Sequence, residues 1–357
     1  MEEKKELGAE PVEAEETAVA ALAALAVEDG ETPLDKNVRL MSPTRMVLRR
    51  FFRSKLSIVG LVMLVTLFLF CWLGPTVYHR WGEIETDRTG RVVYQEYEAG
   101  TEEDPFMQVI VTDKGINLYA EPSAGHLLGT DEKGMDVFTR LMYGGRLSLT
   151  ISFLAVLLTS AIGIVLGGIA GYYGGWVDNV IMRICDVLMC LPTLPLMLII
   201  GTVLDANNVP SEYYIYLLMG ILSLFSWTGM ARLVRGQILF LREQEYMVAA
   251  EAMGYSTPRR IFKHLLPNVL PQILVSMTMS LGSMILYEST LSYLGLGVQI
   301  PYASWGSMVQ VISGNNYVLQ NYFNVWGPPG ICIIIAVLGF NFIGDGLRDA
   351  LDPKQRR

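Results

Sequence analysis

The sequence predicts an all-α protein that crosses a membrane with six helices and carries a small β-rich extracellular insertion between the first two. Three observations support this fold class. The 357 residues are 52% hydrophobic and have a positive mean hydropathy. Several uncharged runs approach or exceed the roughly 20 residues that a helix needs to cross a bilayer. Lysine and arginine gather in alternate connecting segments, which is the pattern of cytoplasmic loops in membrane proteins.

The acidity of the chain belongs to its beginning. The formal net charge is −8, but residues 1–35 hold eleven acids against two lysines, so the remainder is close to neutral. A secretory signal is not expected, because the first long apolar run begins only near Leu56. We therefore expect residues 1–44 to form an acidic, disordered cytoplasmic tail.

Positive charge precedes the first apolar run, Leu56–Leu73. The basic residues are Arg45, Arg49, Arg50, Arg53 and Lys55. Such a flank marks the cytoplasmic side of a span, so residues 45–75 are expected to comprise a basic flank and the first transmembrane helix, with the N-terminus inside. Nucleic-acid binding is not expected, because the patch abuts a membrane helix and lacks interleaved aromatic residues.

Residues 76–136 are expected outside as a small β-rich cap. They carry thirteen acids against five basic residues. The stretches Arg91–Tyr97 and Phe106–Thr112 are strand-like, and Asp113-Lys114-Gly115 predicts a turn before Ile116–Tyr119. Three roles remain open for the cap: contact with a solute-binding protein, protection of a pore mouth, or a spacer without a specific role.

Residues 137–357 are expected to form a core of five further spans. The second span, about Leu149–Tyr172, has glycines at 163, 167, 168 and 171, a spacing that lets helices approach closely inside a bundle. The third, about Ile181–Leu204, is interrupted by Pro192 and Pro195. These prolines demand a kink or unwinding, which makes this span a candidate pore-lining helix.

The fourth span, Tyr213–Met230, runs into Arg232 and Arg235, which mark the inside. Residues 295–325 hold no charged side chain and are rich in aromatic residues and asparagine, which fits an external re-entrant or interfacial segment. The sixth span, Trp326–Ile343, then returns to the cytoplasm. Both termini are therefore expected inside.

The fifth span, about Val269–Tyr293, contains Met277, Met284 and Glu288. Methionines more often indicate flexible core packing, though they also suit a cavity that accepts varied side chains. An acid within a span is costly unless it is paired or wet, so Glu288 is either a residue of the pore mouth or an interhelix hydrogen-bonding group. With Pro192 and Pro195, these three residues are our candidates for the translocation path or its mouth.

The loop of residues 243–268, between the fourth and fifth spans, is expected to be the centre of function. Glu245–Met253 has a helix-forming composition, and Gly254 can take the left-handed conformation that closes a helix. Ser256, Thr257 and Pro258 then favour a new start, so Arg259–Leu266 is predicted as a second short helix that stops before Pro267.

This loop resembles the so-called EAA loop shared by the membrane subunits of ATP-binding cassette importers. The resemblance rests on Ala249-Ala250, Gly254 and Leu266-Pro267. Two positions depart from the family pattern: Val248 stands where an acid is expected, and His264 where an aliphatic residue is common.

Two further segments narrow the resemblance to the dipeptide, oligopeptide and nickel subfamily, closest to the oligopeptide permease C-type subunit. A GTD-x-x-G-x-D motif at Gly129–Asp136 precedes a helix with Gly144, Gly145, Arg146 and Ser148. The chain also closes with MILYESTLSYLGLGVQIPYASWGSMV and NFIGDGLRDALDPK. The resemblance covers about residue 41 to the end, apart from most of the cap.

The resemblance implies a type I ATP-binding cassette importer permease in a bacterial cytoplasmic membrane. The expected solute is an oligopeptide or dipeptide, with nickel, glutathione or an opine as alternatives. Expected partners are a homologous second permease, two cytoplasmic ATPases and an extracytoplasmic peptide-binding protein. The first short helix of the loop is expected to dock in a groove on an ATPase. The candidate coupling residues are Glu245, Tyr246, Ala249, Ala250, Glu251, Gly254 and Pro267.

The chain lacks the sequence signatures of the catalytic classes that we considered. It has no G-x-x-x-x-G-K-[ST] phosphate loop, so ATP and Mg²⁺ are expected on partner ATPase subunits, with no cofactor on this chain. No catalytic or metal-ligating residues are expected, and the four cysteines are expected to act as small apolar residues. An ATP-independent channel or carrier and an intramembrane enzyme remain as remote alternatives, but both leave the loop of residues 243–268 unexplained.

Overall fold

The computed structural model describes residues 43–78, 93–95, 114–298 and 302–351. The chain divides into two compact units, Met1–Arg49 and Arg50–Arg357. Helix α2 (Pro43–Phe51) begins in the first unit and ends in the second. Residues 1–42 of the predicted acidic tail lie outside the described residues.

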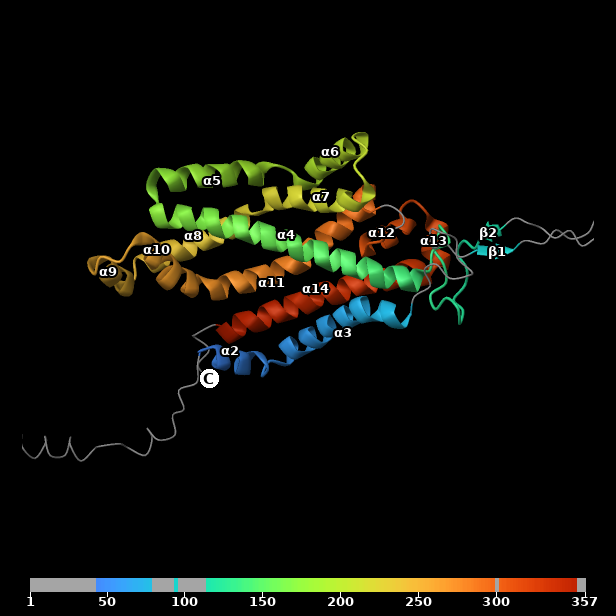
Figure 1. Ribbon diagram of the computed structural model, residues 1–357, viewed down its shortest axis with the longest axis horizontal. Helices are drawn as coiled ribbons and strands as arrows, with labels where there is room; N and C mark the ends of the chain where they lie inside the picture. The colour runs from blue at the N-terminus through green and yellow to red at the C-terminus, as the bar shows by residue number, and fades with distance from the viewer. Residues whose placement is uncertain (1–42, 79–92, 96–113, 299–301, 352–357) are drawn as a thin grey trace, which may run out of the picture. The chain divides into compact units, whose positions relative to one another are not determined.

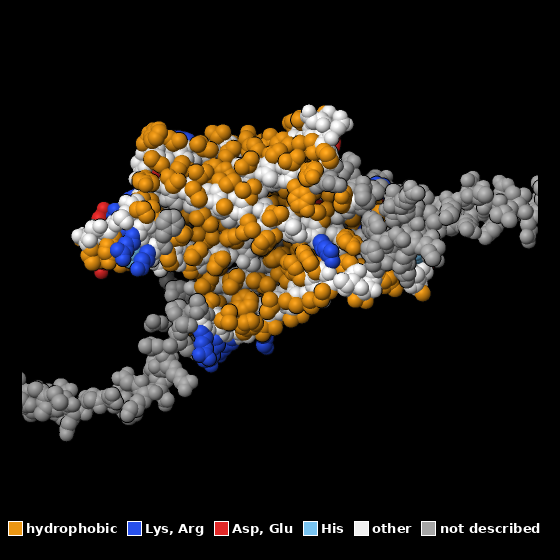
Figure 2. All heavy atoms as spheres, in the orientation of Figure 1, with side chains coloured by type: hydrophobic (Ala, Val, Ile, Leu, Met, Phe, Trp, Pro, Cys, Tyr) orange, Lys and Arg blue, Asp and Glu red, His pale blue; other side chains and the backbone are white. Residues whose placement is uncertain are grey.

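The second unit is a bundle of long helices, with α4 packed between two groups of neighbours (Figure 1). The long helices are α3 (Lys55–Val77), α4 (Val137–Tyr173), α7 (Ser211–Ser226), α8 (Thr228–Arg242), α11 (Leu266–Leu291) and α14 (Phe323–Leu351). In the described part of the chain, five helical stretches are long and apolar enough to cross a membrane, α7 and α8 together forming one of them. Hydrophobic side chains cover the middle of the bundle face seen in Figure 2.

A sixth candidate span is broken at the predicted prolines. Helices α5 (Gly175–Cys190) and α6 (Thr193–Ala206) bend by 79° at the break. Pro192 caps α6, and Pro195 lies in its first turn, where a missing backbone N–H leaves no helical hydrogen bond unmade. The predicted interruption is therefore confirmed. Counting this pair as one span gives six.

Three of the four predicted glycines on α4 lie in close contact with α8 or its N-cap residue. A Cβ at Gly163 would lie 2.6 Å from Met230 Cβ, and one at Gly171 would lie 2.9 Å from the Arg235 carbonyl oxygen. A Cβ at Gly167 would overlap the backbone of Ala231. Residues four apart lie on one helix face, so these glycines form a strip along which the two backbones approach closely.

Gly167→Ala is expected to lower the thermal unfolding temperature of the purified protein in detergent, whereas Gly168→Ala is not. The first change forces a methyl group into the backbone of α8, and overpacking of this kind costs about 1–3 kcal/mol. A Cβ at Gly168 would meet only Ile238 Cδ1, at 3.8 Å, and alanine favours a helix over glycine by roughly 1 kcal/mol. Equal unfolding temperatures for the two variants would contradict the close α4–α8 contact.

Where the structure describes residues 76–136, it does not support a β-rich cap. Strands β1 (Val93–Gln95) and β2 (Lys114–Ile116) form one antiparallel pair of three residues each. The predicted turn at Asp113–Gly115 is wrong, because Lys114 and Gly115 belong to β2. Residues 118–129 are turns, bends and irregular chain. The predicted strand Phe106–Thr112 lies outside the described residues.

Two aspartates of the GTD-x-x-G-x-D motif organise the chain before α4. The carboxylate of Asp131 accepts hydrogen bonds from the backbone N–H of Lys133 and Met135, each at 2.9 Å, and its other oxygen lies 3.2 Å from Arg140 Nε. The carboxylate of Asp136 caps α4 by accepting from Thr139 N–H at 2.7 Å. The motif is therefore built to hold the start of α4.

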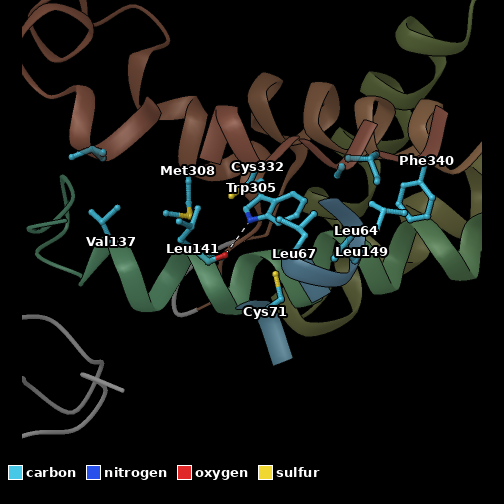
Figure 3. Packing of buried hydrophobic residues seen from close by; sticks show 14 residues of the cluster. Leu64, Leu67, Cys71, Val137, Leu141, Leu149, Trp305, Met308, Cys332 and Phe340 are labelled. Carbon is cyan, nitrogen blue, oxygen red and sulfur yellow. Dashed lines mark hydrogen bonds between the residues drawn. The ribbon is translucent and has the colours of Figure 1, made fainter. Parts of the chain in front are cut away.

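The predicted segment of residues 295–325 folds partly into the bundle. It contains short helices that follow η2 (Ser292–Leu296), namely α12 (Trp305–Val309), η3 (Gln310–Ile312) and α13 (Asn316–Asn321). Trp305 is fully buried and donates from Nε1 to the Leu141 carbonyl oxygen at 3.0 Å (Figure 3). Its ring lies against the position where a Cβ of Gly145 would stand. The tryptophan thus anchors α12 against α4.

The long helices depart from the predicted spans at their ends. Helix α4 joins the predicted helix that contains Gly144 to Ser148 and the predicted second span into 37 continuous residues. Cys71, Cys185 and Cys332 are buried in hydrophobic clusters, as expected of small apolar residues, whereas Cys190 is exposed. Such extended helices place loops at two opposite ends of the bundle, with α9 and α10 at one end and α12 and α13 at the other (Figure 1).

Candidate functional site

The loop of residues 243–268 forms the helix and elbow that the sequence predicts. Helix α9 (Glu245–Ala252) is closed by hydrogen bonds from the N–H of Gly254 to the Glu251 carbonyl, at 2.9 Å, and from the N–H of Tyr255 to the Ala250 carbonyl, at 3.1 Å. Gly254 has a φ of +73°, the left-handed conformation. Glycine adopts it without strain, so this residue fixes where the chain turns after α9.

Helix α9 has one buried and one exposed face. Met247 and Ala250 are buried, while Val248 and Met253 are 60% and 63% exposed. The predicted docking residues therefore separate: Glu245, Tyr246, Ala249, Glu251 and Gly254 are exposed, and Ala250 is not. Ala250 packs inward with Met247. The exposed residues Tyr246, Ala249 and Met253 follow one another at three- and four-residue spacing and form an exposed apolar strip, and Val248 is exposed on another side of the helix.

Polar and aromatic contacts hold α9 and the following turn against the bundle. Arg260 Nη1 lies 2.9 Å from Glu251 Oε1, and its guanidinium carbon lies 5.8 Å from the centre of the Tyr172 ring at the end of α4. Arg242 Nη1 donates to the Tyr172 carbonyl at 2.8 Å. Both cations lie near the C-terminus of α4, where the helix dipole favours positive charge.

The second predicted helix does not stop before Pro267, and that part of the prediction is wrong. Helix α10 (Thr257–Arg259) continues through a π-helical turn, η1 (Arg260–Leu265), directly into α11, giving one helical stretch from Thr257 to Leu296. Pro267 lacks an N–H and would clash with a carbonyl four residues back in a regular helix. The wider π turn just before it relieves this conflict, since Leu266 N–H bonds to the Ile261 carbonyl five residues back.

Arginines at this end also tie α8 to the bent pair. Arg232 Nη2 donates to Asp186 Oδ1 at 2.6 Å. Arg235 makes a two-pronged contact with Asp178, with Nη2 donating to Oδ2 at 2.6 Å. The fourth and third spans are therefore linked by charge at the end that carries α9.

Glu288 is an interhelix hydrogen-bonding group rather than an exposed mouth residue. It is fully buried and accepts hydrogen bonds from Ser148 Oγ of α4 at 2.9 Å and from Ser292 Oγ of η2 at 2.8 Å. Ser148 Oγ in turn accepts from Trp305 N–H at 3.2 Å, and Ser304 Oγ donates to Ser292 Oγ at 3.2 Å. One carboxylate thus joins α4, α11 and the start of α12.

The other path candidates are not brought together. Pro192 and Pro195 are exposed at the α5–α6 break, whereas Met284 is buried and Met277 is partly buried in the core.

A groove of about 280 Å³ lies between α6 and α11. Its lining residues are Leu194, Ser283, Leu286, Tyr287 and Thr290. The four residues from α11 are spaced three, one and three positions apart, so they lie on one face of that helix. This spacing is visible in the sequence, but we did not predict the groove from it.

Two family models match this sequence. Residues 163–357 match the model described as "Binding-protein-dependent transport system inner membrane component", and residues 42–89 match "N-terminal TM domain of oligopeptide transport permease C". The chain is 38% identical over 317 residues to the dipeptide transport system permease protein DppC of Bacillus subtilis (strain 168), which covers 89% of this chain and 88% of the relative.

Two further relatives differ in their named solute. The chain is 35% identical over 308 residues to the oligopeptide transport system permease protein OppC of the same organism, covering 86% of this chain and 88% of the relative. It is 38% identical over 233 residues to the glutathione transport system permease protein GsiD of Pectobacterium atrosepticum, covering 65% and 74%.

Proposed function

Since this chain belongs to the family of binding-protein-dependent transport system inner membrane components, we propose that it is one permease subunit of an ATP-driven peptide importer. The observation that carries the proposal is the loop of residues 243–268. A short helix with an exposed apolar strip is joined through Gly254 to a helix that continues without interruption into a candidate span. Because the helical stretch from Thr257 to Leu296 is continuous, a displacement of α9 moves the part of the chain that spans the membrane.

In this mechanism the partner subunits hydrolyse ATP, and this chain changes conformation in response. Two cytoplasmic ATPase subunits bind ATP and Mg²⁺, and one of them receives the exposed strip of α9 in a groove. When the ATPases close on ATP, α9 moves with them, and the stretch from Thr257 to Leu296 swings with it. A homologous second permease completes the translocation path, and an extracytoplasmic peptide-binding protein delivers the solute.

Charge supports an orientation in a bacterial cytoplasmic membrane. The end that carries α9 holds the basic residues Arg242, Arg259, Arg260 and Lys263, whereas the GTD-x-x-G-x-D motif at the opposite end holds one, Lys133. Basic residues favour the cytoplasmic side, so α9 faces the cytoplasm together with both chain termini. The ATPases of the proposed complex are therefore on the side where ATP is available.

The relatives that match most of this chain are named as peptide permeases, which favours short peptides as its solutes. The relatives named for dipeptides and oligopeptides each cover more than four fifths of it. The glutathione relative covers 65% of the chain, so glutathione is retained as a second candidate. Nickel and opines remain as further alternatives that the resemblance alone suggests.

The test is to tag this chain at its C-terminus, purify it in mild detergent from native membranes, and assay ATP hydrolysis with and without the peptide-loaded binding protein. We expect a second permease and two phosphate-loop ATPases to co-purify, and the loaded binding protein to stimulate hydrolysis. Competition of unlabelled dipeptides, longer peptides, glutathione and nickel against labelled peptide uptake then identifies the solute. A chain that purifies alone and transports without ATPases would contradict the proposal.

A further inference from the structure

Arg260 links three parts of the protein at the base of α9. It is the first residue of the π turn η1, its Nη1 lies 2.9 Å from Oε1 of Glu251 in α9, and its guanidinium carbon lies 5.8 Å from the centre of the Tyr172 ring in α4. Its side chain is 16% exposed, whereas that of Glu251 is 71% exposed. The Arg260 side chain is therefore mostly buried, whereas the Glu251 side chain lies mostly at the surface.

The elbow at Gly254 sets the direction of the chain through its backbone conformation, and side-chain contacts also hold α9. A Cβ at Gly254 itself would meet no atom within 4 Å. Within the described residues, the Glu251–Arg260 contact is the one ion pair that joins α9 to the chain beyond the elbow. The remaining link is apolar, through Met247 packed in a cluster with Leu265.

The π turn determines how Arg260 is oriented relative to α11. A π turn holds one more residue than an α-helical turn, so it rotates the residues before it relative to those after it. Arg260 begins this turn, and the helix continues from it into α11. A force applied to Glu251 thus reaches both the end of α4, through the Tyr172 ring, and the start of α11, through the backbone.

We propose that Arg260 is a positioning residue that couples the movement of α9 to α4 and α11. The inference rests on the proposed function, since it takes α9 as the element that the ATPases move. A guanidinium that lies within about 6 Å of an aromatic ring and pairs with a carboxylate keeps its orientation better than a fully exposed ion pair does, because two groups hold it and its side chain is only 16% exposed. Without Arg260, α9 still docks, but its movement is lost at the elbow.

The experiment uses the complete transporter in liposomes with its peptide-loaded binding protein. It compares wild type with Arg260→Gln, Tyr172→Leu, and the exchange of charges Glu251→Arg with Arg260→Glu. Arg259→Gln is the matched control, because Arg259 is exposed and stacks on Tyr255, at 4.6 Å, rather than on α4. Three quantities are measured: ATPase subunits bound, ATP hydrolysed, and peptide transported per ATP.

We expect Arg260→Gln and Tyr172→Leu to retain the ATPases but to transport about tenfold less peptide per ATP, a loss in the usual range for coupling between sites. The charge exchange recovers part of this loss, and Arg259→Gln resembles wild type. Arg260→Gln with wild-type peptide per ATP overturns the inference and leaves the proposed function intact. If Arg260→Gln fails to accumulate, Tyr172→Leu decides in the same way. A wild-type complex that lacks ATPases overturns the proposed function instead.

Discussion

Gly254→Val is expected to reduce peptide uptake about tenfold or more while the chain still inserts into the membrane. The φ of +73° at this residue places a β-branched side chain in a conformation that costs L-residues roughly 1–2 kcal/mol or more. The variant escapes this strain by changing the direction of the elbow, which turns α9 away from its docked position. Uptake of labelled peptide by cells with matched membrane levels of the chain measures the effect.

Two matched substitutions separate backbone strain from side-chain bulk at the elbow. A Cβ at Gly254 would meet no atom within 4 Å, so size alone has no cost there. Gly254→Asn is therefore expected to retain most uptake, because asparagine tolerates the left-handed conformation. Gly254→Ala should fall between the two. Full uptake by the valine variant, with ATPases still bound, would show that the elbow does not set the position of α9.

Glu288→Ala is expected to destabilise the chain by about 3–5 kcal/mol, the largest stability effect that we predict. The change leaves a cavity in the bundle and removes the acceptor of the Ser148 and Ser292 hydroxyl groups. Because Ser148 also accepts from the backbone of Trp305, the start of α12 loosens as well. The loss of monodisperse protein on heating in detergent gives the apparent unfolding temperature.

Glu288→Gln is the control for this prediction. The amide keeps the length of the side chain and one carbonyl oxygen, to which one serine hydroxyl group still donates, and the other serine hydroxyl group rotates to accept from the N–H₂ group. We expect it to cost about 1 kcal/mol, the size of one adjusted hydrogen bond. If alanine and glutamine variants unfold at the same temperature, the carboxylate does not join the three elements as the geometry indicates.

Local chemistry made several features predictable. Gly254 closes α9 because left-handed backbone at a helix end favours glycine wherever the helix lies in the fold. Pro192 was predicted to interrupt a span because a proline ring is unfavourable in a helix interior, and the break lies there. This local signal is not sufficient by itself, since Pro271 lies inside the continuous helix α11. The apolar runs located the spans, since length and hydropathy are properties of the segment itself.

Some predictions were wrong because they relied on local sequence signals that contacts elsewhere in the fold overrode. Pro267 was expected to end a helix, but the π turn at residues 260–265 accommodates it, and that turn has no strong sequence signature. The strand-like composition at residues 91–119 gave two strands of only three residues among the part of this stretch that the structure describes. Strand formation depends on partners for pairing, which composition does not specify.

The sequence by itself determined that this chain is a polytopic helical membrane protein with a helix–glycine–helix loop typical of importer permeases. These properties depend on residues close together in the chain. Only the tertiary structure decided that Ala250 is buried while Ala249 is exposed, and that Glu288 meets Ser148, a residue 140 positions away. It also decided that Arg260 lies over Tyr172. Which face of a helix packs, and against what, depends on contacts between distant segments, and no local pattern encodes them.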